Sequence, residues 1–183
     1  DEKIILFGAF NLSSKVKGAH LLVDSIKKLE EKVHSKKARK IRLITFGRKN
    51  NFYLDTMLIK WTHLGLIKSD KNLNLILRAA DVFACPSLYC YGPHVVTEAL
   101  INKLPVIAYD TGVSQNSIIN GKNGYLIPKY NNKLFAKALN KIIFNKNFIF
   151  NNRLHARINN SFSIQNETKT IINLAKKDLN KSI

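Results

Sequence analysis

Residues 86–110, PSLYCYGPHVVTEALINKLPVIAYD, constrain the fold more than any other part of the chain. The segment predicts a strand end, a Gly-Pro loop, a helix, a tight turn and a buried strand. Pro93 suits the first turn of the helix, where its missing N–H costs nothing. The unpaired amides and positive dipole end of such a helix favour an anion such as a diphosphate. Glu98, about one turn later, is either a carboxylate that accepts from ribose hydroxyls or an exposed residue of an ordinary strand–helix–strand unit.

Strands alternate with helices along the rest of the chain. Leu22, Ile26 and Leu29 repeat on one face of a predicted helix, and Ser69 is the expected N-cap of another. Strands are predicted over residues 3–9, 42–47 and 82–85, and helices over 18–32, 70–81 and from 131 onward. The 183 residues therefore predict a single doubly wound, Rossmann-like α/β domain with a parallel sheet over residues 1–183.

The segment 86–110 resembles the donor-binding motif of the retaining GT-B glycosyltransferases of family 4. That motif runs Pro-Ser-x-x-Glu, a glycine-containing loop, a second Glu followed by Ala, and then Pro-Val-Ile. The matching residues are Pro86, Ser87, Gly92, Glu98, Ala99, Pro105, Val106 and Ile107. Lys17 and Gly18 resemble the Lys-Gly pair that opens the family's first helix. Cys90 replaces the first Glu of the motif, and Ala9 stands where the family has an Arg.

This resemblance implies the C-terminal, donor-binding half of a GT-B fold, with a C-terminal helix near residues 165–180 that would contact an absent N-terminal acceptor domain. It implies transfer of a sugar, with retention, from a nucleotide-diphosphate sugar to a glycan or lipid-linked acceptor in bacterial surface polysaccharide synthesis. The family uses no essential metal, and a cytoplasmic location is expected. Lys17 and Glu98 take the catalytic roles by this resemblance. The implied donor-binding residues are Gly8, Lys17, Arg48, Ile67, Cys90, Gly92, Pro93, His94, Val95 and Glu98.

The two departures from the family pattern leave an alternative open. A thiol is a weak donor and a weak acceptor, so Cys90 cannot hold a sugar as a carboxylate would. Either a different sugar is bound, with His94 or loop amides supplying the contacts, or sugar recognition has been lost. The alternative to an enzyme is therefore a non-catalytic or degenerate domain that binds a nucleotide or a polyanion.

The formal net charge is +18, and most of the basic residues are lysine. Arg is preferred for reading bases, so this bias argues against sequence-specific nucleic-acid recognition. It fits an anionic substrate, peripheral contact with an anionic membrane leaflet, or a genomic bias without function. The basic cluster Lys36, Lys37, Arg39, Lys40 and Arg42 is predicted to be a solvated connection. Cys85 and Cys90 have neither metal-ligand nor disulfide-scaffold spacing, and no apolar run reaches the length of a membrane span.

Overall fold

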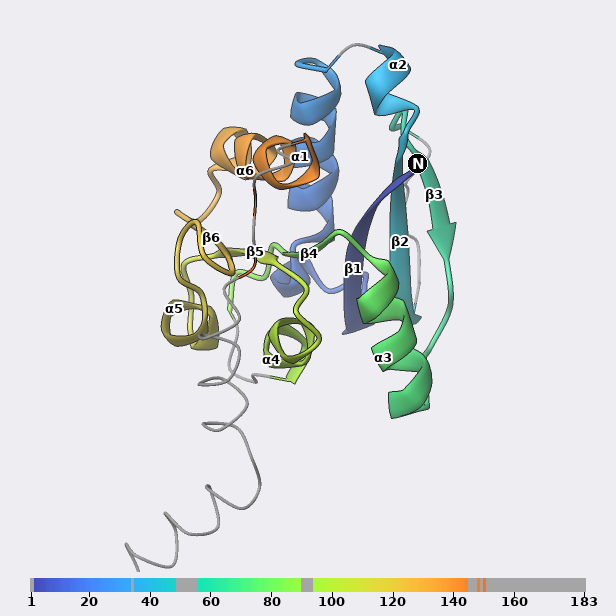
Figure 1. Ribbon diagram of the computed structural model, residues 1–183, viewed down its shortest axis with the longest axis vertical. Helices are drawn as coiled ribbons and strands as arrows, with labels where there is room; N and C mark the ends of the chain where they lie inside the picture. The colour runs from blue at the N-terminus through green and yellow to red at the C-terminus, as the bar shows by residue number, and fades with distance from the viewer. Residues whose placement is uncertain are drawn as a thin grey trace, which may run out of the picture.

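A parallel β-sheet forms the centre of the molecule (Figure 1). The computed structural model describes residues 2–33, 35–48, 56–89, 94–144, 148 and 150. In these residues six strands lie in the order β3-β2-β1-β4-β5-β6, and every neighbouring pair is parallel. The strands are β1 (Lys3–Asn11), β2 (Ile41–Arg48), β3 (Lys60–His63), β4 (Val82–Cys85), β5 (Val106–Tyr109) and β6 (Gly124–Ile127). The predicted doubly wound architecture is confirmed.

Helices cover both faces of this sheet (Figure 1). Helices α1 and α6 pack on one face, and α3 and α4 pack on the other. The helical elements are the 3₁₀ turn η1 (Lys15–Lys17), α1 (Ala19–Glu30), α2 (Ser35–Ala38), α3 (Asp70–Ala79), α4 (His94–Ile101), α5 (Val113–Ser117) and α6 (Asn132–Phe144). This three-layer arrangement explains why the strand sequences are almost continuously apolar, because both faces of each central strand are buried.

The side chains of each central strand alternate between the two layers. In β1, Ile5 and Phe7 pack toward α1 and α6, while Leu6 packs toward α3 and α4. β4 repeats the pattern, with Val82 on the first side and Phe83 on the second. Leu22, Ile26 and Leu29 are all buried, so the predicted apolar face of the first helix is confirmed. Burial of each such side chain contributes about 1.5–3 kcal/mol.

Several local predictions differ from the structure. Ser69 occupies the N-cap position of α3, as predicted, but its hydroxyl makes no capping hydrogen bond. The short helices α2 and α5 were not expected, because four or five residues give no readable periodicity. The basic connection thus contains α2, with Arg39 and Lys40 exposed after it. The helix expected near residues 165–180 lies outside the described residues.

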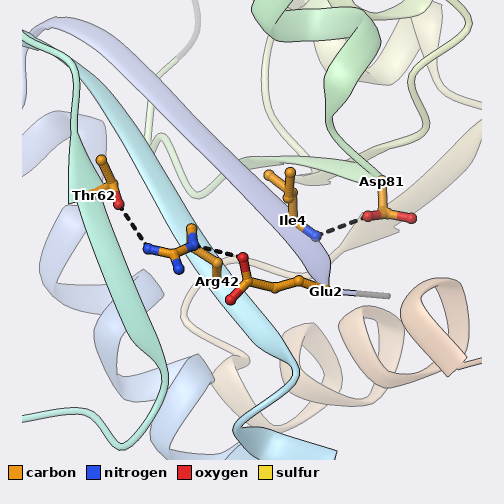
Figure 2. A network of polar contacts seen from close by, with 5 residues as sticks. All are labelled: Glu2, Ile4, Arg42, Thr62 and Asp81. Atoms are coloured by element: carbon orange, nitrogen blue, oxygen red, sulfur yellow. Dashed lines mark hydrogen bonds and ion pairs between the residues drawn. The ribbon is translucent and has the colours of Figure 1, made fainter.

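Ion pairs and hydrogen bonds hold the amino edge of the sheet together (Figure 2). Asp81, just before β4, accepts from Lys3 Nζ at 2.7 Å and from the backbone N–H of Ile4 at 2.8 Å. Arg42, at the start of β2, donates to Glu2 at 2.7 Å and to Thr62 of β3 at 3.0 Å. The hydrogen bond from Arg42 lowers the pKa of the Glu2 carboxyl below its usual value. The carboxylates of Glu2 and Asp81 are therefore each paired with a cation of a neighbouring strand, and Arg42 also joins β2 to β3 through Thr62.

Candidate functional site at the carboxyl edge of β1 and β4

The strand order reverses between β1 and β4, and this is where an open α/β sheet places its ligand. The loop after β1 is strongly ordered by its own hydrogen bonds. Asn11 Oδ1 accepts from Ser13 N at 3.0 Å, and Leu12, which is buried, donates from its backbone to Arg48 O at 2.9 Å. The chain then forms η1, reaches Gly18 with φ of 71°, and enters α1.

The loops after β1 and β4 contact each other directly. Leu88 N donates to Val16 O at 2.8 Å. Two residues after Val16, a Cβ on Gly18 would lie only 1.9 Å from Pro86 O, so no side chain fits at that position. The loop after β5 joins them, because Thr111 Oγ1 donates to Ser87 O at 3.4 Å. Three loops that are distant in sequence therefore meet at the point where the strand order reverses.

Lys17 lies between these two fixed points, one residue after Val16 and one before Gly18. Its backbone N–H donates to Ser14 O at 2.9 Å, so its position is held within η1. Its side chain is half-buried, whereas that of Lys15 is exposed. Neither lysine forms an ion pair with any residue that the structure describes. A lysine whose backbone is fixed just before the start of α1 suits an anionic ligand.

Helix α4 begins at the same edge of the sheet and contains Glu98 as its fifth residue. Glu98 is half-buried, and its backbone carbonyl accepts from Asn102 N at 3.1 Å and from Asn102 Nδ2 at 2.9 Å. Val95 is half-buried on the first turn of α4 and contacts the core on that side of the sheet. The prediction of a helix with Glu98 about one turn inside it is confirmed.

Cys90, Gly92 and Pro93 lie outside the described residues. His94 opens α4, but its side chain is likewise outside them. The role of this loop in donor binding therefore stays a prediction.

Arg48 and Ile67 lie farther along the same edge. Arg48 ends β2, is exposed, and places its guanidinium 4.6 Å from the centre of the Phe10 ring. Ile67 follows β3 and packs against the core beneath α3 and α4. The backbone links the two regions, because Gly47 N donates to Gly65 O at 2.8 Å. The three residues thus lie at or after the carboxyl ends of successive strands: Lys17 after β1, Arg48 at the end of β2 and Ile67 after β3. Their contact with a donor stays a prediction.

Gly8 has a packing role that its sequence context did not reveal. A Cβ at Gly8 would lie 2.0 Å from the Phe46 ring, which covers this position from β2. Gly8 and Phe46 are register partners. A larger residue at position 8 would therefore have to displace the Phe46 ring, so the glycine also serves packing, whether or not it approaches a ligand. Ala9, at the position of the family's Arg, is buried in the other core layer.

Sequence reasoning missed two contacts that build this edge. One is the bond between Leu88 and Val16, and the other is the bond between Thr111 and Ser87. The bond between Thr111 and Ser87 spans 24 residues, and pairing over that separation leaves no local pattern.

The described residues contain no group of three or more His, Cys, Asp or Glu side chains arranged to hold a metal ion. Among the same residues, no helix combines the length and apolar character needed to cross a bilayer.

A sequence model of the family described as glycosyl transferases group 1 matches residues 1–161. The chain belongs to this family. It is 30% identical to spore coat protein SA of Bacillus subtilis over 156 residues, which is 78% of this chain and 40% of that protein.

Solved structures show the same fold. Sucrose-phosphate synthase from Thermosynechococcus elongatus superposes with a TM-score of 0.79 and 21% identity, over 99% of this chain and 46% of that one. Anabaena HepE, in a complex with UDP and glucose, superposes with a TM-score of 0.74 and 19% identity, over 96% of this chain and 48% of that one. The fold is therefore the Rossmann-like domain of GT-B glycosyltransferases, and this chain spans less than half the length of each of these relatives.

Proposed function

We propose that this chain binds the nucleotide-diphosphate sugar in a retaining glycosyltransferase of family 4. The observation that carries the proposal is the junction of the loops after β1 and β4, where the Leu88–Val16 bond and the close packing of Gly18 on Pro86 hold Lys17 at the reversal of strand order. Membership of the glycosyl transferases group 1 family supports it, and so does the UDP that accompanies Anabaena HepE in its complex.

The diphosphate would lie beside Lys17 and the N-terminal amides of α1. Lys17 would stabilise negative charge on the leaving diphosphate as the bond to the sugar breaks. The ribose hydroxyls would donate to Glu98 from above the first turn of α4. Arg48 and Ile67 would border the base, and the loop with Cys90, Gly92, Pro93 and His94 would face the sugar. No metal ion is needed in this scheme, because Lys17 and backbone amides neutralise the diphosphate.

The acceptor would be a glycan or a lipid-linked saccharide, held by an N-terminal half outside these 183 residues. This chain alone would therefore bind nucleoside diphosphates without transferring sugar. The reaction would belong to the synthesis of a bacterial surface polysaccharide in the cytoplasm, in keeping with the family resemblance. The net charge of +18 would draw the protein to the anionic inner leaflet of the membrane.

The second candidate is a domain that binds a nucleotide or a polyanion without catalysis. Cys90 in place of the family's first Glu favours it, as does Ala9, whose buried side chain leaves the β1 end without the family's Arg. Weak transfer with intact nucleotide binding in the full-length protein would support this candidate.

Replacement of Glu98 by Ala tests the proposed donor site. Loss of hydrogen bonds to a charged acceptor should weaken binding of a ribonucleoside diphosphate by about 1.5–3 kcal/mol. Calorimetry with the 2′,3′-dideoxy analogue should show a much smaller change, because that ligand lacks the hydroxyls. The matched control is Glu31→Ala, which removes an exposed carboxylate at the C-terminal end of α1. It should change the affinity for neither ligand. An unchanged preference between the two ligands in Glu98→Ala would place the ribose elsewhere.

A further inference from the structure

An open hollow of about 440 Å³ lies between α1 and the segment that joins β6 to α6. Its lining consists of Lys28, Pro128, Lys129, Tyr130, Asn131, Asn132 and Lys133. Three of these seven residues are lysines, and none carries a carboxylate. Lys28 comes nine residues after Ala19, the first residue of α1. It therefore lies about 14 Å along the helix from the N-terminal end, which is the end near Lys17. Lys28 is thus well removed from Lys17, although Lys129 of the lining contacts Tyr89, which directly precedes Cys90 of the proposed donor loop.

The rim of the hollow is held firmly in place. Tyr109, which is fully buried, donates its hydroxyl hydrogen bond to Asn132 Oδ1 at 2.5 Å. Asn131 caps α6, because its Oδ1 accepts from Leu134 N at 3.0 Å. Asn131 N also donates to Pro128 O at 3.1 Å, which closes the turn before the helix. The lining is therefore preorganised, which lowers the entropic cost of binding a ligand.

Tyr130 has an unusual conformation at this rim. Its φ is 63°, in the left-handed region that bulky residues avoid, and its side chain is 64% exposed. Such backbone strain persists where surrounding structure enforces it, and it is concentrated at ligand-binding sites. The turn presents the Tyr130 ring beside the lysines instead of burying it.

The Asp24 carboxylate lies near this region, since it contributes to the raised pKa of Tyr109, whose hydroxyl bonds Asn132 of the lining, but it forms no ion pair with the lysines of the hollow. Asp24 lies one turn before Lys28 on α1, but no ion pair joins them, and Lys133 has no ion pair within the part of the chain that the structure describes. Lys129 Nζ lies 4.6 Å from the centre of the Tyr89 ring. Three lysines that line one concavity without a carboxylate among them attract an anion, and Lys is a common point-charge ligand for phosphate. The N-terminal end of α6, a helix of 13 residues, adds positive potential to the same place.

We propose that this hollow is a second anion site, which binds a phosphomonoester or diphosphate group through Lys28, Lys129 and Lys133. Tyr130 and Pro128 offer an apolar wall for the group that bears the phosphate. The phosphate can belong to a small soluble molecule or to a lipid headgroup. The proposal does not rest on the proposed sugar transfer, because Lys28, Lys129 and Lys133 are not among the residues assigned to the donor.

Inorganic pyrophosphate is the probe for the first experiment, with amide chemical shifts of the whole chain as the readout at constant ionic strength. We expect saturable shifts at residues 129–133. The double variant Lys28→Gln/Lys133→Gln should lose at least tenfold in affinity at those residues. The matched control, Lys137→Gln/Lys141→Gln, removes two exposed lysines of α6 outside the hollow and should stay within twofold of the parent. Unchanged spectra elsewhere would show that both variants fold.

Equal losses in the two double variants would mean that only diffuse charge attracts the probe, and the proposal would be wrong. It would also be wrong if the only shifts were in residues 12–18, which belong to the nucleotide site. The Lys28→Gln/Lys133→Gln protein should still bind a nucleoside diphosphate at Lys17, so failure here is distinct from failure of the proposed function.

Sedimentation with vesicles identifies the source of the phosphate. Vesicles of phosphatidylcholine with phosphatidic acid are compared with vesicles of equal charge made with phosphatidylglycerol. Preference for phosphatidic acid that is lost in Lys28→Gln/Lys133→Gln would support the site with a lipid ligand. Saturable pyrophosphate binding without that preference would support the site with a soluble ligand.

Discussion

The two ends of the sheet use charge in opposite ways. At the amino edge, Lys3 pairs with Asp81 at 2.7 Å, and Arg42 pairs with Glu2 at the same distance, the latter pair shown in Figure 2. At the carboxyl edge, Lys15 and Lys17 form no ion pair with the described residues, and the aromatic side chains Phe10 and Tyr89 are exposed.

The difference shows where stability and binding reside in the same sheet. The carboxylates of the amino edge hold neighbouring strand ends together, so substitutions there should affect unfolding. The lysines of the carboxyl edge have no such partner, although their backbone is firmly fixed by Val16 and Gly18. Substitutions of those side chains should affect ligands and leave the free energy of unfolding almost unchanged.

The largest effect is expected at Gly18, where the backbone of the carboxyl edge is most constrained. Gly18→Ala introduces a Cβ 1.9 Å from Pro86 O at a φ of +71°. Strain and overpacking together should lower the free energy of unfolding by about 3–5 kcal/mol. Gly65→Ala is the matched control, since Gly65 also has φ of +71° but nothing within 4 Å, and should cost about 1–2 kcal/mol. Urea denaturation measures both, and equal losses would show that Pro86 gives way.

Removal of the Asp81 carboxylate should weaken the amino edge alone. Asp81→Ala leaves the Ile4 N–H and Lys3 without their acceptor, at a cost of about 1.5–3 kcal/mol, with the lower end expected because the side chain is 28% exposed. Lys3→Gln should cost less than about 1 kcal/mol, because its side chain is 41% exposed. Nucleoside diphosphate affinity, measured by calorimetry, should be unchanged in both. A loss of affinity in Asp81→Ala would contradict the separation of the two edges.

Lys17→Gln should have the opposite effect to Asp81→Ala, because it should weaken ligand binding and leave stability almost unchanged. Affinity for a nucleoside diphosphate should fall by about tenfold, or about 1.4 kcal/mol, while affinity for the bare nucleoside changes little. The free energy of unfolding should stay within about 0.5 kcal/mol of the parent, as for most surface substitutions. Lys15→Gln carries the same charge change two residues away and should have a smaller effect on the diphosphate. Equal losses for nucleoside and diphosphate would give Lys17 a structural role instead.

The smallest effect is expected at Tyr109, a structural contact at the carboxyl end of β5. Burial, reinforced by the nearby Asp24 carboxylate, raises the pKa of Tyr109 to about 12. The unfolded chain releases this proton near the usual value of about 10, so the tyrosine's contribution is complete below about pH 10 and is lost as the pH rises toward 12.

Tyr109→Phe removes the hydrogen bond to Asn132 and should cost about 1 kcal/mol at pH 8. The stability gap between parent and variant should narrow between pH 8 and pH 11, as measured by urea denaturation at each pH. A constant gap would mean that Tyr109 ionises equally in the folded and unfolded chains.

Sequence patterns predicted the architecture well because each element satisfies a local rule. The run Val82–Cys85 was predicted with its observed bounds, and the apolar face of α1 followed from the spacing of Leu22, Ile26 and Leu29. The N-cap position of Ser69 was predicted correctly, but the absence of its capping hydrogen bond was not, because the hydroxyl must also point at the first turn. Short helices such as α5 depend on neighbouring loops and leave no period to read.

The candidate site was predictable only in part. Lys17 and Glu98 stand out in sequence, because each lies in a recognisable motif next to a helix start. The packing of Phe46 over Gly8 was invisible, since it depends on the register of β1 against β2. The same limit applies to the hollow at Lys28, whose other lining residues come from a segment about 100 positions later in the chain.

The sequence by itself determined that strands and helices alternate, that the strands are buried on both faces, and that Lys17 and Glu98 lie near helix starts. Those properties follow from residues within one or two turns of each other. Only the tertiary structure decided the strand order β3-β2-β1-β4-β5-β6. That order makes β1 and β4 neighbours and joins Val16 to Leu88 across 72 positions. No local pattern encodes such a contact, because it depends on how the helices pack on the two faces of the completed sheet.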